Sequence, residues 1–77
     1  MLIVNLEKIH STEMGVERIR ENLGLDTVDI VYWCKHKIEN ANDIIRKGKN
    51  WYVSVDDCVI TVNAHSFTII TAHKRRL

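Results

Sequence analysis

Apolar positions change their spacing near residue 43, and this change divides the chain into two halves. Before it, apolar residues recur every three or four positions, which is the spacing of a helix with one buried face. After it, apolar and polar residues alternate, which is the spacing of a strand with one buried face. For a chain of 77 residues, this predicts a single α+β domain: helical over residues 1–40, an antiparallel sheet over 43–73 and a basic tail over 74–77.

One predicted helix has clear signals at both ends. An apolar stripe over residues 16–23 follows a cap at Ser11 or Thr12. It stops at Gly24, a residue suited to a left-handed C-cap. The spacing therefore predicts a helix that begins after the cap and ends at the glycine.

A further helix and a shorter one complete the helical half. A second apolar stripe over residues 27–38, which Val28 widens, follows a cap at Asp26 or Thr27. Residues 2–9 also have helical spacing, over only a turn or two. We therefore expect two to three N-terminal helices to pack on one face of the sheet.

The sheet half contains four segments with strand spacing, separated by short polar connectors. The segments read DIIR, WYVSV, CVITVN and FTIITAH, and the connectors read KGKN, DD and AHS. Two-residue loops at 56–57 and at 64–65 would fix the pairing of a four-stranded antiparallel β-meander. Both loops place the large apolar residues on one face, which we expect the helices to cover: Trp51, Val53, Val55, Cys58, Ile60, Val62, Phe67 and Ile69.

The opposite face of this sheet would be partly polar and partly apolar. An apolar patch there suggests a partner, a second copy of the chain or cover by the N-terminal segment. The expected pairing gives this face three cross-strand rows. One is Tyr52, Thr61 and Thr68; the next is Asn50, Asn63 and Ser66, beside Lys47; the third is Val59 and Ile70. In the same pairing, His73 faces Asp56.

Composition narrows the class of protein. The chain has 45% hydrophobic and 27% charged residues and a net charge of +1, which is typical of a soluble globular protein. No apolar run approaches the roughly 20 residues that span a bilayer. The N-terminus lacks a secretory signal, so we expect a cytoplasmic protein in which Cys34 and Cys58 are reduced. We expect no cofactor and no metal, because no glycine-rich phosphate loop occurs and Cys34 and His36 do not share a helix face.

Charge is spread unevenly along the chain. Residues 1–40 carry five Lys or Arg and seven Asp or Glu, whereas residues 41–77 carry six and three. The C-terminal half is therefore where an anionic partner would bind. At its end, Lys74, Arg75 and Arg76 could contact a phosphate backbone or could be a solvated tail.

His65 is the residue of greatest chemical interest. It lies in a turn at the same end of the predicted sheet as Lys47 and Lys49. It is therefore either a general acid or base beside cations, or a turn residue that tolerates a positive φ. Metal-independent RNA cleavage needs a proton acceptor, a proton donor and cations for the phosphate. The residues predicted for such a site are His65, Lys47 and Thr68 for catalysis, and Lys49, Tyr52, Thr61, Asn63 and Ser66 for substrate binding.

Three phrases of the sequence, MGVERI, GKNWYV and ITVNAHSFTIITAHK, resemble a family of small bacterial proteins of unknown function. More distantly, helices followed by a meander that ends in this last phrase resemble the small ribonuclease toxins related to barnase, colicin nucleases and RelE. That resemblance implies metal-independent catalysis on the polar sheet face. By position it implies a role for His65, Thr68, Thr61, Tyr52 and Lys47.

Two functions remain open on these grounds. The first is a small cytosolic RNA-binding protein or a metal-independent ribonuclease of toxin type, with RNA as its partner. The alternative is a non-catalytic interaction module that forms a homodimer through the open sheet face. The sequence does not decide whether the protein is an enzyme.

Overall fold

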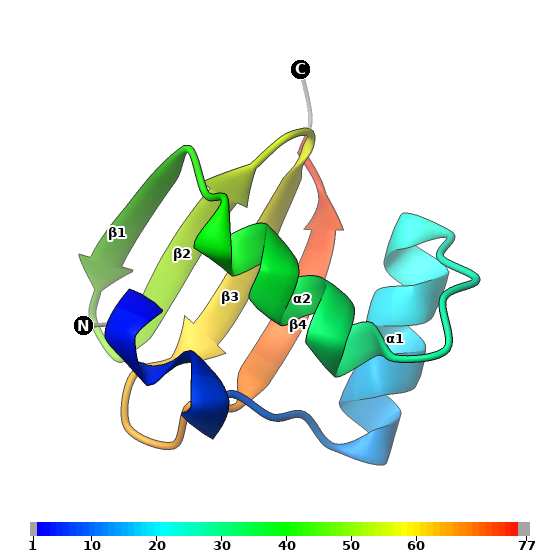
Figure 1. Cartoon of the computed structure of the whole chain (residues 1–77), viewed down its shortest axis with the longest axis horizontal. Helices are drawn as coiled ribbons and strands as arrows, with labels where there is room; N and C mark the ends of the chain where they lie inside the picture. Colours follow the sequence, from blue (N-terminus) through cyan, green and yellow to red (C-terminus); the bar gives the residue numbers. More distant parts are fainter. Residues whose placement is uncertain (1, 76–77) are drawn as a thin grey trace.

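The computed structural model describes residues 2–75, in which helices precede a four-stranded antiparallel sheet (Figure 1). This confirms the predicted α+β class. Residues 76–77 of the predicted basic tail lie outside the described residues. In the described part, no helix combines the length and apolar character that a membrane span requires. The elements are η1 (Ile3–Lys8, a 3-10 helix), α1 (Glu13–Leu23), α2 (Ile30–Glu39), β1 (Asp43–Lys47), β2 (Asn50–Val55), β3 (Cys58–Asn63) and β4 (Ile69–Lys74).

Helix α1 begins and ends where the capping residues predicted. The hydroxyl of Thr12 accepts a hydrogen bond from the backbone N–H of Gly15 at 2.9 Å. Gly24 closes the helix in the left-handed region, with a φ of 62°. Ile19 and Leu23 of the predicted stripe are buried. Local sequence therefore accounts for the whole of this helix.

Helix α2 begins later than the sequence predicted. Its cap is Asp29, not Asp26 or Thr27, and the Asp29 carboxylate accepts from a backbone N–H three residues further on at 2.9 Å. The guanidinium of Arg20 donates to the carbonyl of Thr27 and so holds that residue in the loop between the helices. Val28 is therefore 95% exposed, and its predicted place on the buried stripe is wrong.

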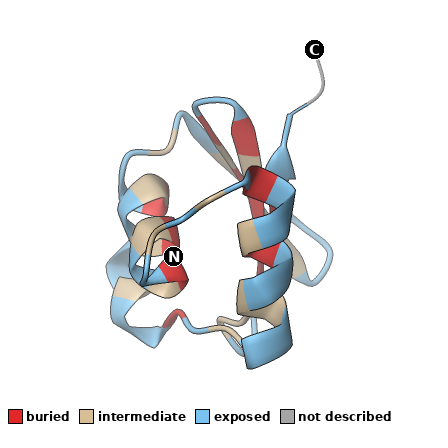
Figure 2. Ribbon diagram, turned by 90° about the vertical axis from the view of Figure 1, so that its right-hand side faces the viewer, coloured by how far each residue is buried: buried red, intermediate tan, exposed pale blue. Residues whose placement is uncertain are grey.

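The core lies between the sheet and the helices, with η1 and α2 across one face of the sheet in Figure 1. Strands β2 and β3 pair in the predicted register, with Val53 opposite Ile60 and Val55 opposite Cys58. Buried positions gather on the inward sides of the helices and in the strands, and the outward sides are exposed (Figure 2). The buried apolar residues are Leu2, Ile9, Ile19, Leu23, Ile30, Cys34, Ile38, Val53, Val55, Cys58, Ile60, Val62, Ile69 and Ala72, with Trp51 and Phe67 packed against them.

The pairing of β3 with β4 departs from the predicted register. Each β3 residue pairs with a β4 residue that lies two or three positions further along the chain than the predicted partner. Val62 pairs with Ile69 instead of Phe67, and Ile60 pairs with Ala72 instead of Ile69. The connecting loop is longer than two residues, and a β-bulge interrupts the ladder between Thr61 and Val62. We call the face that η1 and α2 leave uncovered the open face. Its cross-strand rows change accordingly: Thr61 faces Thr71 instead of Thr68, and Val59 faces His73 instead of Ile70. Asp56 forms an ion pair with Lys37 at 2.6 Å and does not face His73 as predicted.

The two edges of the sheet have different surroundings. Helix α1 runs beside β4 (Figure 1), and the side-chain amide of Asn22 donates to the carbonyl of Ala72 at 3.3 Å. At the start of β4, the N–H of His10 donates to the carbonyl of Phe67 at 3.1 Å, and the carbonyl of His10 accepts from the N–H of Ile69 at 2.8 Å. Within residues 2–75, no strand pairs with the outer edge of β1. The described residues thus cover one edge and leave the other without a strand partner.

Candidate functional site

The turn between β3 and β4 is built by the side chain of Asn63. Its Oδ1 accepts hydrogen bonds from the backbone N–H groups of His65 and Ser66, each at 2.9 Å, and from the Ser66 hydroxyl at 3.2 Å. The turn closes at Phe67, which has a positive φ of 61° although it is bulky. His65 is exposed in this turn, and the positive φ that it was expected to tolerate falls on Phe67 instead. Asn63 and Ser66, predicted to bind substrate, hold the turn together.

A second histidine, His10, lies against this turn. Its Nδ1 lies 2.9 Å from the carbonyl oxygen of Lys8, and its Nε2 lies 3.1 Å from the hydroxyl oxygen of Thr68. Because a carbonyl oxygen only accepts hydrogen bonds, Nδ1 carries a proton, and either Nε2 or the Thr68 hydroxyl donates the hydrogen bond between them. The Thr68 hydroxyl also lies 2.8 Å from the hydroxyl of Ser66. A short chain of hydrogen-bonded groups therefore runs from Asn63 through Ser66 and Thr68 to His10.

Sequence reasoning missed His10. The residue lies 58 positions before Thr68 in the chain, and the two meet only because the N-terminal segment bridges the start of β4. The local signal was limited to a histidine just before a helix cap, which does not identify a partner. Thr68 was predicted on the open face beside Thr61, so the neighbour that it has in the structure was not considered.

Basic side chains gather at the end of the sheet that carries this turn. The backbone N–H of Ala64 donates to the carbonyl of Lys49 at 2.8 Å, which ties the β3–β4 turn to the β1–β2 turn. We call this region the basic end and define it by four exposed cations and two exposed histidines: Lys8, Arg46, Lys47, Lys49, His10 and His65.

Two cations of the basic end lie over aromatic rings. The rings of Trp51 and Phe67 are 5.5 Å apart between centroids. The guanidinium of Arg46 lies 5.6 Å from the centroid of Trp51, and the ammonium of Lys8 lies 5.5 Å from that of Phe67. These interactions hold two positive charges in place beside the turns. Among residues 2–75, Lys47 at the end of β1 and Lys49 in the β1–β2 turn make no ion pair that would neutralise them.

The remaining predicted binding residues lie on the open face. Tyr52 stands between Ile45 of β1 and Thr61 of β3. Tyr52 is 36% exposed, but Thr61 is only 6% exposed and is closed to a ligand. Ile45, Lys47 and Tyr52 line a shallow hollow over β1 and β2. Of this row, Tyr52 is therefore the residue with a ring available for stacking on a base.

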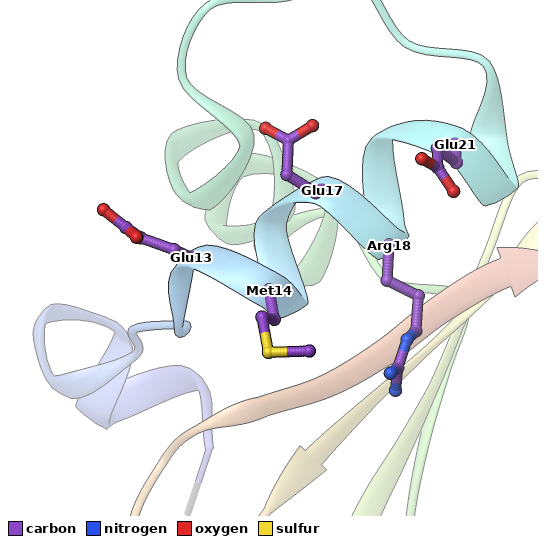
Figure 3. Close-up of a pocket in the computed structure, with 5 residues that line it drawn as sticks. All are labelled: Glu13, Met14, Glu17, Arg18 and Glu21. Atoms are coloured by element: carbon purple, nitrogen blue, oxygen red, sulfur yellow. The ribbon is translucent and has the colours of Figure 1, made fainter.

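The outer side of α1 has the opposite charge. Glu13, Glu17 and Glu21 recur every four residues, while Met14 and Arg18 project from the helix on the side of the strands (Figure 3). The five side chains line a shallow surface hollow. All of them belong to one helix and are exposed. Such an acidic surface repels a polyanion, so a nucleic acid would favour the basic end.

The cysteines do not extend the site. Burial raises the pKa of the Cys34 thiol to about 12, and burial also raises the pKa of the Cys58 thiol. Both groups therefore stay protonated at neutral pH and are poor nucleophiles. Within the described residues, no three His, Cys, Asp or Glu side chains are grouped so that they could hold a metal ion.

Comparison with known proteins places the chain in a family. No curated protein and no solved structure matches it. The likeness to ribonuclease toxins therefore remains a hypothesis that rests on the sequence pattern. One family model, described as a protein of unknown function (DUF3781), matches residues 3–73 and so runs from η1 into β4. Since the match covers most of the 77 residues, the chain belongs to this family of proteins of unknown function.

Proposed function

We propose that the protein binds RNA at its basic end. The observation that carries the proposal is the gathering of four cations, from η1, from β1 and from the β1–β2 turn, around two turns that are hydrogen-bonded to each other. Cations grouped in this way bind a phosphate backbone by releasing its counterions. Tyr52 lies in the neighbouring row of the open face and offers an exposed ring to a base.

Binding can be measured by the fluorescence anisotropy of a labelled single-stranded RNA at several salt concentrations. The double variant K47A/K49A is expected to bind more weakly. The slope of the logarithm of its affinity against the logarithm of salt concentration should also be smaller, by about one unit for each phosphate that the protein no longer neutralises. The matched control K35A/K74A removes the same charge from α2 and from the last position of β4. Equal losses in the two variants would mean that only net charge matters, and the basic end would be abandoned as the site.

The same groups suit metal-independent RNA cleavage. In that reaction the ribose 2′ oxygen loses its proton to a base and bonds to the adjacent phosphorus, while the bond to the 5′ oxygen breaks and that oxygen takes a proton from an acid. We assign the base to His10, whose Nε2 lies 3.1 Å from the hydroxyl oxygen of Thr68, within hydrogen-bonding distance. His65 in the neighbouring turn supplies the acid, and Lys47 stabilises charge on the phosphate.

Cleavage of a labelled RNA in the presence of EDTA tests these roles. His10→Ala and His65→Ala are each expected to lower the rate by about 100-fold or more. His36→Ala is the matched control, because it removes an exposed histidine of α2 that stacks on Tyr32. If the pure wild-type protein binds RNA and does not cut it, the catalytic roles are withdrawn and RNA binding alone remains.

A second function, self-association, is favoured by the open face. Ile45 and Tyr52 are 51% and 36% exposed there, and Ile70 of β4 is 43% exposed. Exposed apolar side chains of this kind are typical of contact surfaces. We infer that the protein can act as a non-catalytic interaction module that forms a homodimer through this side of the sheet. Sedimentation equilibrium over a wide range of protein concentration tests it, and a monomer throughout the range would exclude it.

A further inference from the structure

Strand β1 presents a charge pattern that is complementary to itself. Asp43, Ile45 and Lys47 lie on the open face, and their partners on β2 are uncharged. The two charged residues are four positions apart in a strand, about 13 Å, which is too far for them to pair with each other. Neither of them forms an ion pair within residues 2–75. Each charge therefore lacks an ionic partner among the described residues.

The backbone of β1 also directs unpaired groups outward. The N–H of Asn42 donates to the carbonyl of Ser54 at 2.8 Å, so Ser54 directs its backbone toward β1 and its partner Asp43 belongs to a hydrogen-bonded pair. Hydrogen-bonded and non-hydrogen-bonded pairs alternate along an antiparallel ladder. The N–H and C=O groups of Ile44 and Arg46 therefore point away from β2, where they can receive another strand.

We propose that a second copy of this chain pairs with β1 edge to edge and antiparallel, with Ile45 opposite its counterpart on a two-fold axis. In this register, Ile44 of each copy exchanges both backbone hydrogen bonds with Arg46 of the other. Asp43 of each copy then faces Lys47 of the other, which gives two cross-strand pairs of opposite charge. The two Ile45 side chains meet in the centre, beside the hollows that they line with Tyr52.

Charge and hydrogen bonding select this register over its neighbours. A parallel arrangement would place Asp43 against Asp43 and Lys47 against Lys47, which is unfavourable. A shift of one residue would place the outward backbone N–H and C=O groups of one copy opposite backbone groups of the other copy that already bond to β2. A shift of two residues would move Asp43 of one copy away from Lys47 of the other. The occupant is a second copy because an antiparallel copy carries the same charges in reverse order.

This inference rests on the second proposed function, self-association, and places its contact at the β1 edge of the open face. A contact between two five-residue strands belongs to the small interfaces, those below about 1,200 Å². We therefore expect a weak dimer that dissociates further as salt screens its two charge pairs.

Sedimentation velocity over a range of protein concentration tests the register by charge exchange. Asp43→Lys and Lys47→Asp each place like charges opposite one another, and each is expected to raise the dimer dissociation constant by about tenfold or more. The double variant D43K/K47D restores opposite charges and is expected to return to within about threefold of the wild-type value. Asp57→Lys and Lys74→Asp are matched reversals away from β1 and are expected to leave the constant unchanged.

The outcomes separate this inference from the functions proposed above. A wild-type protein that stays monomeric at millimolar concentration overturns both the edge pairing and self-association. A dimer that is insensitive to the single reversals, or that the double variant does not restore, overturns the edge pairing alone. Asp43→Lys also separates the dimer from RNA binding, because it adds a cation: dimerisation should fall while RNA affinity is kept or rises. Circular dichroism of each variant establishes that it is folded.

Discussion

The two edges of the sheet differ in how far other parts of the chain cover them. The edge of β4 is covered by α1, by the side chain of Asn22 and by the backbone of His10. The outer edge of β1 meets no further strand in the described part of the chain and has only its shortness and its charges to discourage other strands. Helix α1 closes one edge while it buries Ile19 and Leu23 in the core. One element thus stabilises the fold and shields an edge, and the opposite edge stays available.

The difference also places the proposed base and the proposed dimer contact at opposite edges of the sheet, although Lys47 belongs to both the basic end and the dimer contact. The hydrogen-bonded chain that ends on His10 lies where the N-terminal segment meets the covered edge. The self-complementary charges of Asp43 and Lys47 lie on the open edge. Four sets of variants test how far the two edges differ, beginning with the one expected to have the largest effect.

Truncating α1 where it enters the core should have the largest effect. Ile19 is fully buried, so Ile19→Ala removes packing and leaves a cavity, and we expect a loss of about 2–5 kcal/mol in the free energy of unfolding. Urea denaturation followed by tryptophan fluorescence measures this loss. Arg18→Ala, on the exposed side of the same helix, should stay within about 0.5 kcal/mol of wild type. Similar losses in both variants would show that α1 does not depend on its buried stripe.

Removing the hydrogen bond from Asn22 to the β4 edge should have a smaller effect. Asn22→Ala deletes the donor to the carbonyl of Ala72, and we expect a loss of about 1 kcal/mol in the same urea measurement. Glu21→Ala, one position away on the outer side of α1, is the matched control. An unchanged stability in Asn22→Ala would mean that water replaces the amide at no cost, and the edge would then be protected by packing alone.

Breaking the hydrogen bond between Thr68 and His10 should cost less again, because both side chains are partly solvated. Thr68→Val keeps the shape of the side chain and removes the hydroxyl that is hydrogen-bonded to His10. A double-mutant cycle with His10→Ala is expected to give a coupling of about 0.5 kcal/mol. A coupling of zero would argue that the two residues do not interact in solution, and the assignment of His10 as a base would lose its structural support.

The smallest effect on stability is expected at the open edge. Asp43→Ala and Lys47→Ala remove exposed charges that have no ionic partner in the described chain. At a protein concentration low enough for the monomer, we expect each to change the free energy of unfolding by less than about 0.5 kcal/mol. A larger change would show that these charges stabilise the monomer, and their role in pairing with a second copy would lose support.

The two hairpins show how far the sequence predicted the sheet. The 56–57 connector is a two-residue loop, so alternation along β2 and β3 was enough to predict their register. At the next turn, the Asn63 side chain organises a longer loop that closes with Phe67 at a positive φ, and a bulge follows. A turn governed by a side chain and a bulge leave no mark in a pattern of alternating residues. The prediction of a two-residue loop there was therefore wrong.

The candidate site was predicted in part for a similar reason. Lys47 ends β1, and Lys49 and His65 lie in turns. The order of the strands in a meander already places these positions at one end of the sheet. His10 and Lys8 join them from the N-terminal segment, which no local pattern connects to β4. Thr61 was predicted to bind substrate because of its residue type and its face. Its burial depends on the neighbours that surround the centre of the sheet.

Local sequence was enough to establish the helix and strand periods, the caps of α1 and the membership of most of the core. These follow from local geometry, because the spacing of apolar residues selects the element and the face that it buries. Tertiary packing was needed to establish that α1 covers the β4 edge, that His10 meets Thr68 and that the charges of β1 remain without ionic partners in the described chain. Those facts depend on contacts between residues far apart in the chain, whose geometry is set by the packing of whole elements and not by any single stretch of sequence.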